Sequence, residues 1–264
     1  MDTIEKGNRK IVLFSGGYDS TLVLARLAKE AEDGTRVCAV SIEHNITGMQ
    51  KLRREYESQL LILRELRKQF PKIKIEHEVI HVESNWISGD TYNSRGLAQP
   101  ILWLCNIIPL LEDKDTIYFG YNQNDQAMLH QENINNLIQA ACKIQEGKII
   151  YTHYPIKYFP KAEVLKTLIE EFPNLVELCT SCEAIRYEGE KVCGECTPCT
   201  HLKEALLNIS LNNTEVGEKA KQLLKDKFGL RITVEREEDT NEVNEPSEDS
   251  EDSEEPTEDL VKES

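Results

Sequence analysis

The sequence feature that most constrains the fold is the segment Phe14-Ser-Gly-Gly-Tyr-Asp-Ser20, which joins an apolar run to a stretch with helical spacing. Residues 10–14 are rich in β-branched side chains and predict a buried parallel strand. Residues 20–31 carry a broad apolar face and predict a helix. Two adjacent glycines let the backbone bend sharply and approach a ligand closely. Together with the two serines and the free N–H groups of a helix start, they predict an anion-binding loop.

Strand and helix patterns alternate from this loop to about residue 175. We expect further strands at 36–42, 75–82, 116–119 and 149–151, and further helices at 50–70, 97–111 and 134–145. Strands that alternate with helices form βαβ units, in which the strands are parallel. The predicted fold class is therefore α/β, a Rossmann-like and mostly parallel sheet with helices on both faces.

The C-terminal third of the chain departs from this pattern. A cysteine-rich stretch precedes two short helices, expected at about 200–207 and 214–228. Residues 235–264 carry a net charge of -13, whereas the rest of the chain carries only -3. Such a polar segment cannot bury enough surface to offset its ordering entropy, so we expect it to be disordered. The predicted domains are an α/β domain at 1–175, a cysteine-rich helical region at 176–234 and this acidic tail.

Composition also excludes several classes of protein. No apolar run approaches the roughly 20 residues that a membrane span needs. The polar N-terminus is unlike a signal peptide, so a cytoplasmic protein without a membrane partner is expected. The nearly neutral body disfavours a nucleic-acid partner, because such affinity usually needs a basic face. The oligomeric state stays open, with a homodimer among the options.

The chain has eight cysteines, and their distribution is uneven. Without a secretion signal they are unlike a disulfide framework, because the cytosol keeps thiols reduced. Cys38, Cys105 and Cys142 stand alone in apolar surroundings and are expected in the core. The other five crowd between residues 179 and 199, and this clustering predicts a metal site.

Four of these five form the pattern Cys182-x10-Cys193-Gly-Glu-Cys196-Thr-Pro-Cys199. A CxxC turn brings two thiols within reach of one metal ion. Four thiolates with no open position are typical of a structural zinc site. An iron–sulfur cluster is the alternative, whereas a redox dithiol needs fewer thiols. Cys179 lies outside the pattern.

The segment from Phe14 to Ser20 matches the SGGxDS signature of the pyrophosphatase-loop (PP-loop) ATP enzymes. It lacks the lysine of the Walker phosphate loop, so it does not resemble a kinase or a GTPase. The resemblance implies that ATP is split into AMP and pyrophosphate while a substrate oxygen is adenylated. It also implies that Asp19 is catalytic and helps to place Mg²⁺. The ATP-binding stretch that carries over is Phe14, Ser15, Gly16, Gly17, Tyr18, Asp19, Ser20, Thr21, Leu22, Val23 and Leu24.

Two shorter matches extend this resemblance. Residues 120–126 resemble a GHxxDDQ segment of several PP-loop enzymes, in which Gly120 and Asp125 match. Asp125 is then a catalytic residue that orients Mg²⁺ or substrate; alternatively, it caps the next helix. A proline followed by the pair Lys161 and Glu163 resembles a further family segment that opens a helix. Lys161 would neutralise charge on the phosphates; alternatively, it is a solvated lysine near a helix start.

The phosphate loop and the cysteine pattern together resemble the 7-cyano-7-deazaguanine synthase (QueC) family of queuosine-precursor biosynthesis, over about residues 10–207. Residues 42–47 depart from the stretch that follows the family's second strand. In residues 93–96 only Arg95 matches the family's substrate segment, so Arg95 is the predicted substrate-binding residue, with a surface arginine as the alternative. The resemblance implies that the zinc ligands are Cys182, Cys193, Cys196 and Cys199.

In that family, 7-carboxy-7-deazaguanine is adenylated, ammonia displaces AMP to give the amide, and a second ATP dehydrates the amide to the nitrile. The resemblance therefore implies an ATP-dependent C–N ligase that uses Mg²⁺ and zinc. The first alternative is a QueC-like enzyme of an antiphage defence system, which conjugates the activated deazaguanine to a partner protein. A tRNA-modifying PP-loop enzyme and a non-enzymatic nucleotide-binding scaffold are the others.

Overall fold

The strands predicted from the sequence pair into one parallel sheet. The computed structural model describes residues 9–44, 49–83, 99–145, 147–184, 192–212 and 214–232. Within them, the strands are β1 (Lys10–Leu13), β2 (Arg36–His44), β3 (Lys74–Val82), β4 (Thr116–Tyr118) and β5 (Tyr151–His153). They pair in the order β3-β2-β1-β4-β5, and every pairing is parallel. The predicted α/β fold class is confirmed.

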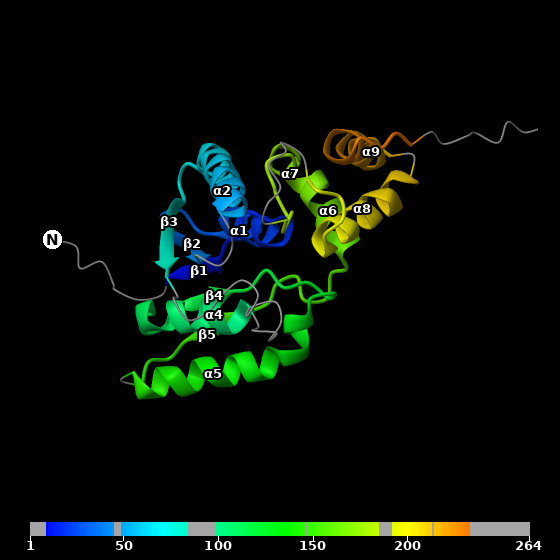
Figure 1. Cartoon of the computed structure of the whole chain (residues 1–264). Helices are drawn as coiled ribbons and strands as arrows, with labels where there is room; N and C mark the ends of the chain where they lie inside the picture. The colour runs from blue at the N-terminus through cyan, green and yellow to red at the C-terminus, as the bar shows by residue number, and fades with distance from the viewer. Residues whose placement is uncertain are drawn as a thin grey trace, which may run out of the picture. The chain divides into compact units, whose positions relative to one another are not determined.

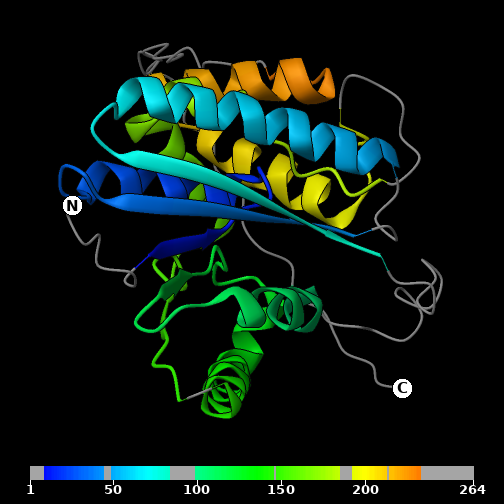
Figure 2. The same ribbon diagram turned by 90° about the vertical axis from the view of Figure 1, so that its left-hand side faces the viewer.

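Helices cover both faces of this sheet (Figures 1 and 2). On one face lie α1 (Tyr18–Glu30), α2 (Met49–Gln69), α6 (Lys161–Glu171), α7 (Pro173–Val176), α8 (Thr197–Ser210) and α9 (Glu215–Phe228). On the other lie α4 (Gln99–Ile107), the 3-10 helix η2 (Ile108–Leu110) and α5 (Gln131–Ile144), which follows the 3-10 helix η3 (Gln126–His130).

Side-chain alternation along β1 separates the two apolar cores. Val12 packs with α1, α2 and the C-terminal helices, whereas Ile11 and Leu13 pack with α4 and α5. This is the period-2 pattern of a strand that is buried on both faces. The described residues of α8 and α9 share one apolar core with α1, so the C-terminal helices pack directly against the element that follows the phosphate loop.

The strand order reverses beside β1. The chain passes from β1 to β2 on one side, and β4 pairs with β1 on the other. In open parallel sheets, ligands bind at the carboxyl ends of the strands where the order reverses. The loops that follow β1 and β4 therefore meet at the edge where a ligand is expected.

The structure corrects three local predictions. The helix predicted over 97–111 ends as an α-helix at Ile107 and continues only as η2, because Pro109 lacks an N–H and crowds the preceding turn. The strand predicted at 149–151 lies at Tyr151–His153, where it finds its partners in β4. Cys105 is exposed, whereas Cys38 and Cys142 are buried as expected.

Some predictions lie outside the described residues. These are Arg95, residues 45–47 of the departing stretch 42–47 and the acidic tail 235–264. Among the helices that the structure describes, none combines the length and the apolar character needed to cross a lipid bilayer.

Candidate active site

The chain leaves β1 through a tight loop and enters α1 at once. Gly16 has a φ of +77°, a conformation that side-chain-bearing residues rarely adopt. A Cβ atom at Gly16 would also lie 3.2 Å from both Ser58 Oγ and Gln59 Cγ of α2. Gly17 is the N-cap residue of α1 and makes no side-chain cap bond. The unpaired N–H groups of this helix start thus lie at the carboxyl end of β1, where an anion is favoured.

The two predicted serines of the loop contact one another. Ser15 Oγ and Ser20 Oγ are 3.2 Å apart, and the Gly17 N–H donates to Ser15 Oγ at 3.3 Å. Ser20 Oγ donates to the Gly17 carbonyl at 3.3 Å. These bonds close the loop on itself around the start of α1.

Donors from β2, from α2 and from the segment that follows α7 hold the loop in place. The Phe14 carbonyl accepts from Ser41 Oγ of β2 at 2.7 Å. The Gly16 carbonyl accepts from Ser58 Oγ of α2 at 3.2 Å and from the Thr180 N–H at 3.1 Å. Because each carbonyl is satisfied inside the protein, the loop conformation is set before any ligand arrives.

The remainder of the predicted ATP-binding stretch lies inside the core. The side chains of Thr21, Leu22, Val23 and Leu24 are buried in α1. Tyr18 is buried as well. The ammonium groups of Lys161 and Lys227 lie over its ring, with their Nζ atoms 5.6 Å and 5.7 Å from the ring centroid. These side chains therefore pack α1 against the protein and position the loop.

The loop after β4 approaches α1 very closely. A Cβ atom at Gly120 would lie 2.9 Å from both the Cα and the N of Ser20, closer than real side chains approach backbone. Only glycine fits there without a shift of one segment. This close approach brings residues 121–126 alongside the first turn of α1.

Asp19 is the centre of a polar network at this junction. Its Oδ1 accepts from Asn122 Nδ2 at 3.0 Å, and its Oδ2 forms an ion pair with Lys161 Nζ. The Asn122 N–H donates to Asp125 Oδ2 at 2.7 Å. All three predicted catalytic residues, Asp19, Lys161 and Asp125, thus meet at one point, although they come from three separate elements.

The electrostatic environment distinguishes these groups. Burial raises the pKa of the Asp125 carboxyl, and the nearby Asp19 charge adds to the increase, while the Asn122 N–H and Lys161 oppose it. Asp125 occupies the N-cap position of η3 but its side chain makes no cap bond there, because it accepts from Asn122 instead. Lys161 is the first residue of α6, where the helix dipole disfavours a cation, and the ion pair with Asp19 compensates for this placement.

The four predicted metal ligands converge. The Sγ atoms of Cys182, Cys193, Cys196 and Cys199 all lie within 4.8 Å of one another. A tetrahedral ion with metal–sulfur bonds of about 2.3 Å sets its sulfur atoms about 3.8 Å apart. Cys193 Sγ and Cys199 Sγ are 3.9 Å apart, so the thiols fit a single tetrahedral ion.

Backbone N–H groups donate to these thiols. Cys193 N donates to Cys182 Sγ, and Cys196 N donates to Cys193 Sγ, each at 3.4 Å. Burial opposes ionisation of Cys193, but the surrounding N–H donors outweigh it and lower its pKa to about 7. Cys179 is buried outside the cluster, donates to the Leu175 carbonyl at 3.3 Å, and has its pKa raised by burial to about 12. Cys179 is thus a core residue.

Sequence reasoning missed the residues that support the site. Asn122 falls at an unspecified position of the segment that resembles GHxxDDQ, and Ser58 and Thr180 belong to no motif. Only the placement of Asn122 between Gly120 and Asp125 could have drawn attention to it. The other two are identified only by their contacts with Gly16.

No protein-family model and no curated protein sequence matches the chain. Among solved structures, it is similar to the U34-tRNA thiolase NcsA from Methanococcus maripaludis with its 4Fe-4S cluster, at 16% identity and a TM-score of 0.42, over 85% of this chain and 75% of that one. It is also similar to the NMN synthetase from Francisella tularensis, at 12% identity and a TM-score of 0.34, over 87% of this chain and 90% of that one. Likenesses of this size do not decide function, so the function must be inferred from the residues of this chain.

Proposed function

We propose that the chain is an ATP-dependent enzyme that adenylates a 7-deazaguanine carboxylate, such as 7-carboxy-7-deazaguanine. The single observation that carries the proposal is the junction of Asp19, Lys161 and Asn122 at the start of α1, where the strand order reverses. An anion-binding loop beside a carboxylate and a lysine is suited to phosphate chemistry. The deazaguanine substrate comes from the family that the SGGxDS and cysteine motifs resemble.

In this proposal, the loop from Ser15 to Ser20 holds the β- and γ-phosphates of ATP. A carboxylate oxygen of the substrate attacks the α-phosphorus, the bond from that phosphorus to the bridging oxygen breaks, and pyrophosphate leaves. Lys161, which pairs with Asp19 in the free protein, neutralises the charge that develops on the phosphates. The preorganised loop then stabilises the departing pyrophosphate without rearranging.

Asp19 and Asp125 are the residues that would hold Mg²⁺. Carboxylate oxygens are the ligands that this ion prefers, and the two groups lie near enough for the Asp19 charge to raise the pKa of Asp125. Bound Mg²⁺ would neutralise charge on the phosphates. Asn122 keeps both carboxylates in position, since its side chain donates to one and its backbone to the other.

The acyl adenylate then needs a nucleophile. Ammonia attacks the activated carbon, AMP leaves, and an amide is formed. A second ATP activates the amide oxygen, and loss of AMP and a proton gives the nitrile. The protein contributes to both rounds through the same loop, because each begins with transfer of AMP to an oxygen of the substrate.

Zinc is the metal that we assign to the four cysteines, in a structural role. The ligand set has no open position, and Cys182 lies two residues after Thr180, whose N–H donates to Gly16. Arg54 of α2 also donates to the Ala184 carbonyl at 2.7 Å. Zinc would therefore hold the segment 178–184 against both the phosphate loop and α2.

The proposal is tested by incubating the purified chain with ATP, Mg²⁺, 7-carboxy-7-deazaguanine and nitrogen-15-labelled ammonium, followed by mass spectrometry. We expect AMP and a labelled amide or nitrile, and none of these with the Asp19→Ala variant. Absence of any labelled product and of AMP from the folded, metal-loaded protein would overturn the proposal.

A second candidate keeps the adenylation and changes the acceptor to an amine of a partner protein. The feature that favours it is the tail of net charge -13, which suits docking to a basic protein. In the same experiment without ammonium, this candidate predicts AMP release that rises when the partner is added, together with a partner that carries the mass of the deazaguanine acyl group.

A further inference from the structure

A lysine of the last C-terminal helix lies close to the phosphate loop without a carboxylate partner. Lys227 belongs to the last turn of α9, and its ammonium donates to the Cys179 carbonyl at 3.0 Å and to the Glu177 carbonyl at 3.5 Å. Among the residues that the structure describes, no carboxylate forms an ion pair with it, whereas Lys219 of the same helix pairs with Glu177. Burial lowers the pKa of Lys227, because the ammonium has lost part of its hydration. A cation that is removed from water without a counter-charge is unfavourable.

This ammonium lies over the residue that opens α1. Lys227 Nζ is 5.7 Å from the centroid of the Tyr18 ring, and Lys161 Nζ is 5.6 Å from the same centroid. Tyr18 directly follows Gly17, the N-cap residue of α1, where the unpaired N–H groups favour an anion. Two cations therefore share one ring at the predicted phosphate site. Lys161 is paired with Asp19, so the charge of Lys227 is the one left to be balanced.

The carbonyls that Lys227 contacts belong to the segment that supports the loop. Cys179 is followed by Thr180, whose N–H donates to the Gly16 carbonyl at 3.1 Å. These carbonyls follow α7 and carry only partial negative charge, so they balance only part of a full ammonium charge. The Tyr18 ring beside the ammonium is buried, and charges interact more strongly across such an interior than across water.

The packing of α9 fixes Lys227 in this place. The helix begins at a cap in which Thr214 Oγ1 accepts from the Gly217 N–H at 3.1 Å, and it ends at Gly229, which has a φ of +71°. Between these ends, Leu223 and Leu224 are buried in the core that α9 shares with α1. Tertiary packing, and no motif of the sequence, thus brings the lysine to Tyr18.

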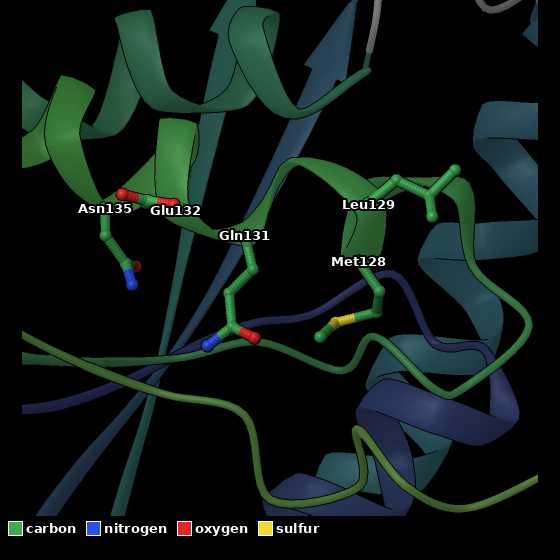
Figure 3. Close-up of a pocket in the computed structure, with 5 residues that line it drawn as sticks. All are labelled: Met128, Leu129, Gln131, Glu132 and Asn135. Atoms are coloured by element: carbon green, nitrogen blue, oxygen red, sulfur yellow. The ribbon is translucent and has the colours of Figure 1, made fainter.

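A hollow of about 350 Å³ at η3 and the start of α5 does not suit the missing anion (Figure 3). No lysine or arginine lines it, and the carboxylate of Glu132 would repel a negative charge. Its lining residues are Met128, Leu129, Gln131, Glu132 and Asn135.

The cysteine cluster is another source of negative charge near Lys227. Four thiolates around a divalent ion carry a net negative charge. However, Cys199 affects the pKa of Lys227 less than Cys179 and Glu177 do, so the cluster is the weaker counter-charge. The start of α1, where the loop awaits an anion, is the better match.

We infer that Lys227 is a further residue of the ATP site, whose ammonium offsets the charge of the β- and γ-phosphates at the start of α1. It is a positioning residue, because its N–H groups are bonded to main-chain carbonyls and it acts on the phosphates through its charge. The inference rests on the proposed function, which places ATP at this loop. It also gives α9, which follows the QueC-like stretch 10–207, a role in the site.

The test is the binding of inorganic pyrophosphate and of ATP, each with Mg²⁺, to the purified metal-loaded chain by calorimetry. Lys227→Gln and Lys227→Met both remove the charge, and glutamine keeps an N–H donor. Lys227→Arg keeps the charge, and Lys225→Gln is the matched control at an exposed position of α9. We expect the Gln and Met variants to bind both ligands about tenfold more weakly, and the Arg variant and the control to stay within about threefold of the wild type.

Two further readouts separate this role from a structural one. KM for ATP should rise about tenfold in Lys227→Gln while kcat stays within about threefold, because the charge acts alike on bound ATP and on the departing pyrophosphate. The melting temperature of the ligand-free Lys227→Gln variant should not fall, because an ammonium without a counter-charge does not stabilise the fold.

Three outcomes would overturn the inference. Lys227→Gln binds both ligands as tightly as the wild type does, Lys227→Met alone loses affinity, or Lys227→Gln loses zinc and stability while keeping its affinity. The second outcome would assign Lys227 a hydrogen-bonding role, and the third would make it the counter-charge of the cysteine cluster.

The same experiment separates this inference from the proposed function. If the wild type binds pyrophosphate about tenfold more tightly than Lys227→Gln but releases no AMP from ATP and the acid, the inference stands and the proposed reaction fails. If the wild type releases AMP and both proteins bind pyrophosphate equally, the reaction stands and the inference fails.

Discussion

The phosphate loop and the cysteine cluster are held in place by different forces. The carbonyls of the loop accept from Ser41 of β2, Ser58 of α2 and Thr180 of the segment after α7. The cysteine thiols accept weak N–H···S bonds from their own neighbourhood. Hydrogen bonds from the surrounding fold therefore shape the first site, whereas the second, in our proposal, depends on a metal ion to bring four anionic thiolates together. A change at the loop should affect chemistry, and a change at the cluster should affect folding.

The two regions are nevertheless joined through one short segment. Thr180 bonds to the loop, and Cys182, two residues later, belongs to the cluster. Loss of the metal should therefore weaken the support of the loop as well.

The largest effect is expected at Asp19. Asp19→Ala should lower AMP release by about 10⁴-fold, or about 5 kcal/mol, because it removes the partner of Lys161 and, in the proposed mechanism, a ligand for Mg²⁺. Its melting temperature should fall by only a few degrees, since the partly exposed pair contributes about 1 kcal/mol or less. Steady-state kinetics measure the rate of AMP release, and calorimetry measures the melting temperature. A variant that releases AMP at the wild-type rate would show that Asp19 has no catalytic role.

At the cysteine cluster we expect the reverse: a substitution should reduce stability. The purified chain should carry about one zinc ion, and Cys196→Ser should reduce both zinc content and stability, by about 3 kcal/mol or more. Cys179→Ser, outside the cluster, should keep its zinc. Elemental analysis and denaturant unfolding measure these effects. Stoichiometric iron and labile sulfide in the purified protein would contradict the zinc assignment.

Gly120→Ala should lower both the stability of the fold and kcat moderately. The added Cβ atom would lie 2.9 Å from the backbone of Ser20, so the two segments must separate at a cost of about 1–3 kcal/mol. Since Asn122 and Asp125 move with them, kcat should fall by about 10- to 100-fold. Gly34→Ala is the control, because its φ of +85° makes it strained but no atom lies within 4 Å of its Cβ position. It should lose stability and keep kcat.

The pH dependence should report Asp125. Burial raises the pKa of this carboxyl, so its ionised form is lost at a higher pH than for an ordinary aspartate. Activity that needs the ionised form should therefore fall as pH drops through this raised pKa, and Asp125→Asn should remove that limb of the kcat/KM profile. The sign for stability is opposite, since a raised carboxyl pKa makes the folded state relatively more stable as pH falls. If the acidic limb of the kcat/KM profile persists unchanged in Asp125→Asn, the limb reports the titration of another group.

The smallest effect is expected from deletion of residues 235–264. The segment has no apolar stripe to pack and no motif that could complete the site, so AMP release with a small substrate should stay within about twofold. Salt sensitivity and docking to a basic partner should change instead. If the folded, truncated chain loses AMP release, the tail belongs to the catalytic unit.

The sequence predicted those parts of the molecule that local patterns determine. The strand before Ser15 and the helix after it follow from apolar periodicity, and the clustering of four thiols follows from the crowding of the cysteines between residues 182 and 199. Pro109, which ends α4, was visible in the sequence, but the apolar run around it suggested a longer helix. The shift of β5 by two residues was not predictable, because register is set by pairing with β4.

The candidate site was also predictable only in those parts that local patterns determine. Asp19, Asp125 and Lys161 were predicted one by one from motifs, but their meeting point follows from the close approach that Gly120 permits. Asn122 falls at an unspecified position of its motif and is identified only by its contacts with Asp19 and Asp125. Long-range contacts of this kind are decided by tertiary packing, which local patterns do not encode.

The central claim is that the loop at β1 transfers AMP to a carboxylate oxygen. It is tested most directly with 7-carboxy-7-deazaguanine labelled with oxygen-18 in its carboxylate, ATP, Mg²⁺ and ammonium, and mass spectrometry of the released nucleotide. If the carboxylate attacks the α-phosphorus, one heavy oxygen must appear in AMP when ammonia displaces it. Unlabelled AMP, or ADP in its place, would contradict adenylation of the substrate.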